Sequence, residues 1–434
     1  MKKTRLLMLL VSVCVVLVLA ACGAPAPAPS VTYTSPDRGE DATYSSPDRG
    51  EDATYSSSDR EDDAVYTQAA TPAAAPAEPI KWGIILELTG FGADYGAEAK
   101  MAIEMRLEEA NYEAGGRPIE VIWEDDATTP AVALEKAKKL VEADGVDFIQ
   151  GPIWSDAHLV MAPYLAETNT LANALESSTW ELREYGNWVV FTGTSRSYST
   201  PLGDWLYNEG YRTATSLSAD YAFGYEVVGG PLDKFVERGG TVIQEQWVPY
   251  GTIDYGPFIT ALDDEADVFV CWQAGADMQR LMTQYYEFGG KIPVAMPSCS
   301  SIRSEQMAEV GEDMLGIVGV DTYSWTLDYP ANLKFVRAFE AKFGKKPQMV
   351  HSTAYTVTSY LLAGIEATGG DTSIEVLRPA ILNLELFTPH GPLTFSPSGY
   401  AISPRVMVEA KMVDGQYTWD AIQIFPGERD PRDQ

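Results

Sequence analysis

The feature that most constrains this chain is an alternation of short apolar runs with amphipathic stretches, which begins at Ile80. Residues 81–86 read Lys-Trp-Gly-Ile-Ile-Leu, a run typical of a buried strand. The following stretch predicts a helix, because apolar residues recur three or four positions apart on one face. That inward face carries Ala99, Ile103, Leu107, Ala110 and Ala114.

The same unit repeats directly afterwards. A strand is predicted at 119–123, a helix with Thr129 as its N-cap and Pro130 in its first turn, and a strand at 146–150. Strand, helix, strand, helix, strand indicates a parallel sheet with helices on both faces.

A second set of such units starts near residue 212, with strands predicted at 212–217, 241–248 and 267–272 and a helix near 225–238. Met278, Leu281, Met282 and Tyr285 follow the spacing of a buried helix face. Some 350 residues are too many for one core, so the sequence predicts two doubly wound, parallel-sheet α/β lobes.

The N-terminus carries export signals. Lys2, Lys3 and Arg5 precede an apolar run from Leu6 to Ala20, which is too short for a membrane span. The run ends in Leu19-Ala20-Ala21-Cys22, which resembles a bacterial lipobox. We therefore expect a signal peptide at 1–21 and a lipidated Cys22 that holds the protein on a membrane face.

Residues 22–79 follow as the lipidated cysteine and an acidic, Pro-rich tether. Tyr33, Tyr44, Tyr55 and Tyr66 recur every eleven residues, within a segment almost devoid of aliphatic side chains. Such a composition cannot bury a core, which predicts disorder. The tether contributes to a net charge of −31 for the chain, and this charge argues against binding to nucleic acid.

Two cysteines remain in the folded part, Cys271 and Cys299. A disulfide between them is one possibility in an exported protein. Both follow strand-like apolar runs, which favours two separate buried thiols.

Several short motifs, in order, resemble the type I periplasmic binding proteins, and within them the leucine/isoleucine/valine-binding branch of ABC transporter substrate-binding proteins. The resemblance covers about Ile80 to Phe425. The motifs are Leu88-Thr89-Gly90, Tyr95-Gly96, Glu109-Ala110-Asn111, Gly115-Gly116, Glu124-Asp125-Asp126, Gly151-Pro152 followed by Ser155, and Gly391-Pro392-Leu393-Thr394-Phe395 with Gly399.

This resemblance implies that three crossover strands join the lobes, near 191–199, 320–329 and 386–392. The expected first lobe is 80–195 plus 325–388, the second is 196–324 plus 389–425, and 426–434 is a tail. The ligand lies between the lobes, where strand ends and helix N-termini meet.

The resemblance also implies the ligand-binding hydroxyls. Ser155 follows a strand and begins a helix, so it is also a natural N-cap, and its family position contacts a ligand carboxylate through the hydroxyl and the backbone N–H. Ser178 matches the second hydroxyl for that carboxylate, and Ser177 is the alternative.

In the second lobe, the loop Asp220-Tyr221-Ala222-Phe223-Gly224 matches the segment that supplies an aromatic wall, with Phe223 as the best match and Tyr221 as the alternative. Trp272 and Gln273 end a predicted strand and are expected to reach the cleft. Trp154 and Trp180 also stand near strand ends, so a tryptophan-lined pocket would suit a ligand with a flat or apolar part.

The chain departs from the family at one position. Amino-acid binders of the family usually carry an acidic residue after the strand that corresponds to the one ending near Met296, and this residue pairs with the ligand's ammonium group. Here residues 297–301 read Pro-Ser-Cys-Ser-Ser, and Cys299 is a candidate lining residue. Either Asp156, Glu176 or Asp220 takes this role, or the ligand is an aromatic acid or amide without an ammonium group.

No catalytic pattern is present. The three histidines, His158, His351 and His390, are widely separated, and neither a nucleophile elbow nor a phosphate-binding loop occurs. Asp125 and Asp126 could suggest a cation site, but neighbouring residues at a strand end point in opposite directions, so we interpret both as solvated loop caps. We expect neither enzymatic activity nor a metal or cofactor.

The sequence thus predicts an extracytoplasmic, membrane-anchored lipoprotein that binds an amino acid or related small carboxylate as a monomer and delivers it to an ABC permease. The alternative is a sensor of the same fold, which passes the ligand-bound form to a signalling partner.

Overall fold

The computed structural model describes residues 77–176, 178–430 and 432–433. The predicted signal peptide, Cys22 and almost all of the tether lie outside these residues, as does Ser177. None of the helices in the described ranges has the length and apolarity needed to cross a membrane.

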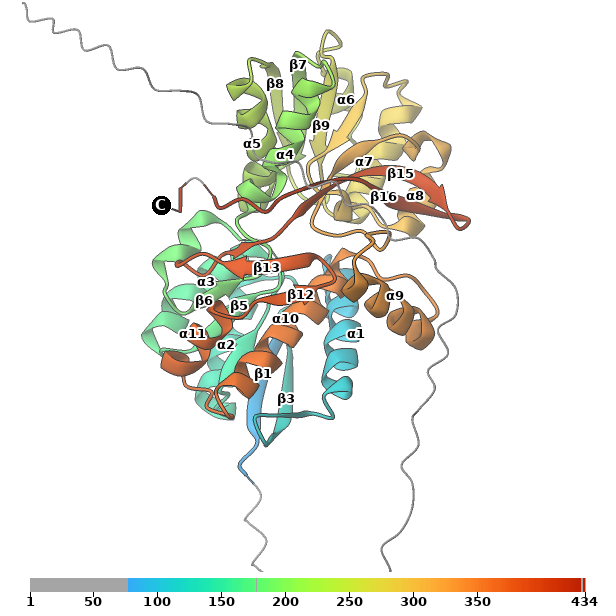
Figure 1. Ribbon diagram of the computed structural model, residues 1–434. Helices are drawn as coiled ribbons and strands as arrows, with labels where there is room; N and C mark the ends of the chain where they lie inside the picture. Colours follow the sequence, from blue (N-terminus) through green and yellow to red (C-terminus); the bar gives the residue numbers. More distant parts are fainter. Residues whose placement is uncertain (1–76, 177, 431, 434) are drawn as a thin grey trace, which may run out of the picture. The chain divides into compact units, whose positions relative to one another are not determined.

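The first lobe is built on a six-stranded sheet in the order β2-β3-β1-β4-β5-β6, parallel apart from the short β2 (Figure 1). Its elements up to the first crossover are β1 (Ile80–Leu86), α1 (Ala93–Glu109), β2 (Glu113–Ala114), β3 (Arg117–Asp125), α2 (Pro130–Lys138), a π-helical segment (Lys139–Asp144), β4 (Phe148–Gln150), α3 (Ser155–Glu167), β5 (Leu171–Ala174), a 3-10 turn (Trp180–Glu184) and β6 (Trp188–Val190).

The second lobe holds a seven-stranded sheet in the order β16-β15-β11-β10-β9-β7-β8. Its elements are α4 (Ser195–Asn208), β7 (Thr213–Ala219), α5 (Ala222–Glu237), β8 (Thr241–Val248), α6 (Gly256–Thr260), β9 (Val268–Trp272), α7 (Ala276–Glu287), β10 (Val294–Met296), a 3-10 turn (Cys299–Ser301), α8 (Ser304–Val310), a second 3-10 turn (Glu312–Met314), β11 (Val318–Asp321), β15 (Arg405–Val413) and β16 (Gln416–Phe425).

The remaining elements return the chain to the first lobe, where α10 packs against α1. They are α9 (Pro330–Phe343), α10 (Met349–Ala367), α11 (Ile374–Leu382) and the antiparallel strands β12 (Leu386–Thr388), β13 (Gly391–Phe395) and β14 (Ala401–Ile402). The predicted fold class, two α/β lobes with mainly parallel sheets, is confirmed.

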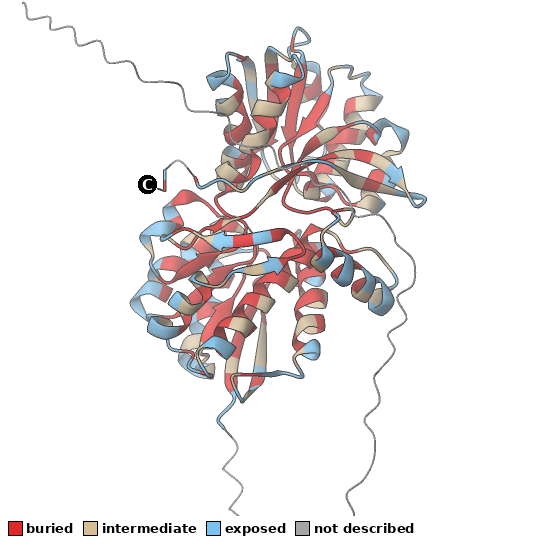
Figure 2. Cartoon of the chain, viewed as in Figure 1, coloured by how far each residue is buried: buried red, intermediate tan, exposed pale blue. Residues whose placement is uncertain are grey.

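Burial explains why these runs fold as they do. Trp82 on β1 is fully buried, packs edge-on against Phe148 of β4 at 4.8 Å between ring centroids, and donates its indole N–H to Gln150 at 3.0 Å. In the second lobe the predicted stripe of α7 is buried at all four positions, Met278, Leu281, Met282 and Tyr285. Figure 2 shows the same division, with buried strands inside and exposed outer helix faces.

Three details differ from the sequence prediction. Ala114 lies in β2 and not on the helix, because α1 ends at Glu109. The third crossover comes later than 386–392: β13 pairs with β12, Tyr400 bridges Val190 of the first lobe, and only β15 joins the second sheet. The described part of the expected tail is also packed, since Thr194 donates a hydrogen bond to Asp430 at 2.5 Å.

The cysteines and the paired acids behave as interpreted, with one exception. Cys271 and Cys299 are buried and unbridged, so two separate thiols are confirmed. Asp125 caps its loop by accepting backbone hydrogen bonds from Leu88 and Ala127. Asp126 is fully buried instead of solvated, although its carboxylate does accept the Thr128 N–H at 2.8 Å.

Candidate functional site

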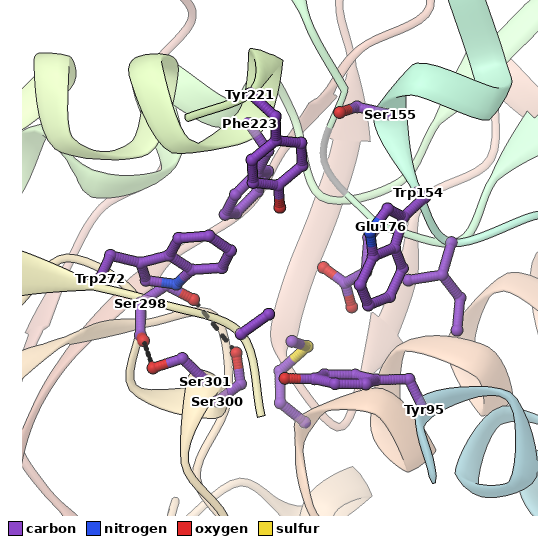
Figure 3. A pocket seen from close by; sticks show the side chains of 13 residues that line it. Tyr95, Trp154, Ser155, Glu176, Tyr221, Phe223, Trp272, Ser298, Ser300 and Ser301 are labelled. Carbon is purple, nitrogen blue, oxygen red and sulfur yellow. Dashed lines mark hydrogen bonds between the residues drawn. The ribbon is translucent and has the colours of Figure 1, made fainter. Parts of the chain in front are cut away.

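A pocket lies between the lobes, with about 480 Å³ of empty space including its open mouth. Its walls come from the segments that follow the carboxyl ends of parallel strands, where such folds bind ligands. The lining residues are Tyr95, Ile153, Trp154, Ser155, Glu176, Tyr221, Phe223, Trp272, Ala274, Ser298, Ser300, Ser301 and Met349 (Figure 3).

Aromatic side chains dominate both sides of the pocket. On the first-lobe side, Tyr95 and Trp154 pack edge to face with their centroids 5.3 Å apart. On the second-lobe side, the Trp272 ring lies 5.0 Å from Phe223 and 5.8 Å from Tyr221. Figure 3 shows these two groups facing each other across the pocket. A flat or apolar molecule between them would be in contact with rings from both lobes.

The first-lobe side of the pocket also carries a hydroxyl group at the N-terminus of helix α3. Ser155 is the first residue of α3 and is 2% exposed, and its Oγ has no hydrogen-bond partner within the described part of the chain. Trp154 occupies the cap position, so the expectation that Ser155 caps the helix is wrong. The Ser155 hydroxyl is therefore available to a ligand oxygen at the positive end of the helix dipole.

Glu87, which follows β1, holds the loop that leads into α3. Its Oε1 accepts hydrogen bonds from the backbone N–H of Ile153 at 2.9 Å and of Trp154 at 3.1 Å. Burial raises the pKa of Glu87 to about 8, and the nearby Asp126 carboxylate adds to this rise. These two N–H groups are thus occupied by the protein and are not available to a ligand.

The serine loop 298–301 forms the opposite polar wall. Asp321 fixes this loop, because it accepts the Ser300 N–H at 2.6 Å and the Tyr198 hydroxyl at 2.9 Å. Burial raises the pKa of Asp321 to about 6, and these hydrogen bonds oppose the rise. Ser301 donates to the carbonyl of Ser298 at 2.8 Å. The loop presents hydroxyls where the family's amino-acid binders place an acid.

The structure brings together five of the predicted site residues: Ser155, Glu176, Tyr221, Phe223 and Trp272 line the pocket. Of the three tryptophans considered, Trp154 also lines it, whereas Trp180 packs against Tyr400 with the ring centroids 5.6 Å apart.

The other five predicted residues do not line the pocket. Ser178 is buried with its Oγ 3.2 Å from His158 Nδ1, and Asp220 is exposed and accepts a hydrogen bond from the Tyr225 hydroxyl. Gln273 and Cys299 are fully buried and are not among the lining residues, and Asp156 is half-buried on α3. Neither Asp156 nor Asp220 is among the residues that line the pocket.

Sequence reasoning did not identify Tyr95, Ile153, Ala274 or Met349 as lining residues. In the loop 297–301 it named Cys299 instead of the lining residues Ser298, Ser300 and Ser301. For Tyr95 a signal was present, since the Tyr95-Gly96 motif had contributed to the family resemblance. Met349 comes from α10, 48 positions beyond Ser301, which is the nearest other lining residue in the chain, and no local pattern marks it. Within the described ranges, no group of His, Cys, Asp and Glu side chains could hold a metal ion.

Comparison of the chain with known proteins identifies its family. The family model described as "Periplasmic binding protein" matches residues 79–415. The chain belongs to this family. The predicted relationship to the leucine/isoleucine/valine-binding branch is confirmed as well.

Among relatives of this periplasmic binding protein, Leu/Ile/Val-binding protein homolog 6 of Brucella melitensis is 27% identical over 370 residues, which cover 83% of this chain and 95% of that protein. An ABC transporter substrate-binding protein from Sphaerobacter thermophilus superposes with a TM-score of 0.77 at 27% identity, covering 81% of this chain and 99% of that one. A solute-binding protein from Rhodopseudomonas palustris, in complex with 3,4-dihydroxybenzoic acid, gives a TM-score of 0.78 at 24% identity, covering 82% and 99%.

Proposed function

We propose that this periplasmic binding protein is the solute-binding lipoprotein of an ABC importer. It is held outside the cytoplasm by lipid on Cys22, binds one small solute per monomer between its lobes and delivers it to a permease. One observation carries the proposal: aromatic walls from both lobes, Tyr95 and Trp154 on one side and Phe223 and Trp272 on the other, enclose one pocket. A solute in contact with both walls ties lobe closure to binding, which a permease can detect.

The ligand that suits these walls is a small carboxylate with a flat or apolar body. Its oxygen meets the buried Ser155 hydroxyl at the start of α3, where the helix dipole favours negative charge. Its body lies between the rings. Ser178 stays a predicted carboxylate partner, although its hydroxyl lies beside His158.

Glu176 is the only acidic side chain among the described residues that line the pocket, and Figure 3 shows it entering from the Trp154 side. An ammonium group beside Glu176 would therefore lie toward the first lobe, opposite to the arrangement expected in the family. The serine loop 298–301 instead suits hydroxyl or amide groups on the ligand.

A matched set of solutes tests this proposal. The purified full chain is heated with L-phenylalanine, 3-phenylpropionate and 3-phenylpropionamide, which share a carbon skeleton and differ in the ammonium and carboxylate groups, and with L-leucine. A ligand at 100-fold excess over Kd adds about 2.7 kcal/mol to the free energy of unfolding. Absence of a shift with these probes and with a wider panel of amino acids, aromatic acids and amides would contradict solute binding.

Ser155→Ala tests the placement of the ligand carboxylate. Loss of this partner is expected to weaken binding of a carboxylate by about 1–3 kcal/mol. Ser195→Ala is the matched control, because Ser195 is also a buried first residue of a helix, α4, with an unbonded hydroxyl, but does not line the pocket. Calorimetric titration should show a loss of affinity for the carboxylate ligand in Ser155→Ala and wild-type affinity in Ser195→Ala. Wild-type affinity in Ser155→Ala as well would show that the carboxylate binds elsewhere.

A further inference from the structure

An ion pair is buried at the boundary between the lobes, beside the pocket. Arg303 donates through Nε to Glu98 Oε1 at 2.5 Å, and the two side chains are 8% and 10% exposed. Glu98 lies on α1 of the first lobe, whereas Arg303 directly precedes α8 of the second lobe. The pair therefore joins the two lobes at a site from which water is almost excluded.

Arg303 also contacts the wall of the ligand pocket. Its guanidinium lies over the Tyr95 ring at 4.1 Å from the ring centroid, a cation–π geometry. Tyr95 lines the pocket and packs against Trp154, whereas Arg303 itself lines an adjoining cavity. One side chain of the second lobe thus holds both a carboxylate and an aromatic pocket residue of the first lobe.

The energetics of such a pair depend strongly on the distance between the lobes. With the lobes together, each charge has lost its water and is stabilised mainly by the other. When the lobes separate, both groups regain water and neither needs a partner. Removal of one charge therefore penalises the closed arrangement, in which the remaining ion is buried alone, and leaves the open arrangement almost unaffected.

We propose that Glu98 and Arg303 form a latch that sets the balance between open and closed lobes, with Arg303 as a positioning residue for Tyr95. The inference rests on the proposed function, in which the lobes close over a solute. Of the residues in this arrangement, only Tyr95 lines the pocket, so the latch affects lobe closure and ligand affinity without a contact to the polar groups of the ligand.

The test measures the distance between the lobes in the ligand-free full chain. Spin labels are placed at the exposed positions Glu167 at the end of α3 and Glu287 at the end of α7, and double electron–electron resonance gives the populations of the two arrangements. We expect a detectable closed population in the wild type. Glu98→Gln and Arg303→Gln should each lower the closed-to-open ratio by about 100-fold or more.

Two further variants separate a latch from general damage. The double variant Glu98→Leu with Arg303→Met buries no charge and should recover most of the closed population, as apolar replacement of buried pairs is well tolerated. Glu305→Gln is the matched control: the exposed Glu305 of α8 accepts a hydrogen bond from Gln348 at 3.1 Å across the same boundary, and an exposed contact of this kind contributes little.

Wild-type protein with a single open population, or single variants with wild-type distance distributions, would overturn the latch. The measurement needs no ligand, so this failure is distinct from failure of the proposed function, which the solute panel decides. A double variant that stays as open as the single variants would also overturn it, because the effect would then come from lost packing and not from unpaired charge.

Discussion

Gly96 offers a sharp test of how the fold positions the pocket. It lies in the first turn of α1, next to Tyr95, where the helix passes the end of β1. A Cβ atom on Gly96 would stand 2.1 Å from the carbonyl oxygen of Glu87, whereas real Cβ contacts essentially never fall below 3.0 Å. Because the obstacle is backbone, Gly96→Ala must move the helix away from the strand by about 0.9 Å.

The cost follows from two opposing effects. Overpacking of a close contact costs about 1–3 kcal/mol, and a backbone obstacle belongs at the upper end of that range. Alanine recovers up to about 1 kcal/mol as the better helix former. We therefore expect Gly96→Ala to lower the free energy of unfolding by about 2 kcal/mol. Urea denaturation measures this change. Since Tyr95 moves with the helix, the affinity for the pocket ligand should fall as well.

Gly186→Ala is the control, because a Cβ at the exposed Gly186 meets no atom within 4 Å. This variant should match the wild type in both stability and affinity. A Gly96→Ala protein with wild-type stability would refute the argument that backbone contact between α1 and β1 fixes Tyr95 at the pocket.

Two further predictions follow from buried ionisable groups. Burial raises the pKa of Glu87 to about 8 from its ordinary value of 4.5, so between these pH values the folded protein holds a proton that the unfolded chain has lost. The free energy of unfolding therefore has its full contribution from Glu87 at low pH and loses it as the pH rises to about 8. Glu87→Gln should therefore flatten the fall in the free energy of unfolding between about pH 5 and pH 8, measured by urea denaturation, and an unchanged slope would contradict this. Burial likewise raises the pKa of the Cys271 and Cys299 thiols, so a thiol reagent should label neither until the protein is unfolded. Peptide mapping by mass spectrometry distinguishes them from Cys14 and Cys22, and rapid labelling of Cys271 or Cys299 in the native protein would contradict this.

The fold could be predicted because periodicity reports burial directly. A helix that buries one face must repeat its apolar residues every three or four positions, and the stripe from Met278 to Tyr285 did so without exception. The third crossover was misplaced because the run at Gly391–Phe395 does not itself show which strand it pairs with. The pairing of this run with β12 and the bridge between Val190 and Tyr400 determine where the crossover lies. Both are tertiary contacts that the local sequence does not show.

The pocket was predictable only to the precision of a strand end. Trp272 ends β9 and lines the pocket, while its neighbour Gln273 is fully buried outside it, since successive residues leave a strand in opposite directions. Beyond the end of β7, Tyr221 lines the pocket while the neighbouring Asp220 is exposed. A position in the sequence identifies the loop, but the course of the backbone through that loop decides which of its residues line the pocket.

Charged residues were the least predictable because their partners lie far away in the chain. Glu98 adjoins the buried Ala99 on α1 and would be assigned to a solvated helix face, yet Arg303, 205 positions later, makes it a buried ion. Asp126 was interpreted as a solvated cap and is buried near Glu87. A buried charge is tolerable only with its partner in place. The two misassigned acids therefore mark long-range contacts of the fold: Glu98 joins the two lobes through Arg303, whereas Asp126 lies beside Glu87 within the first lobe.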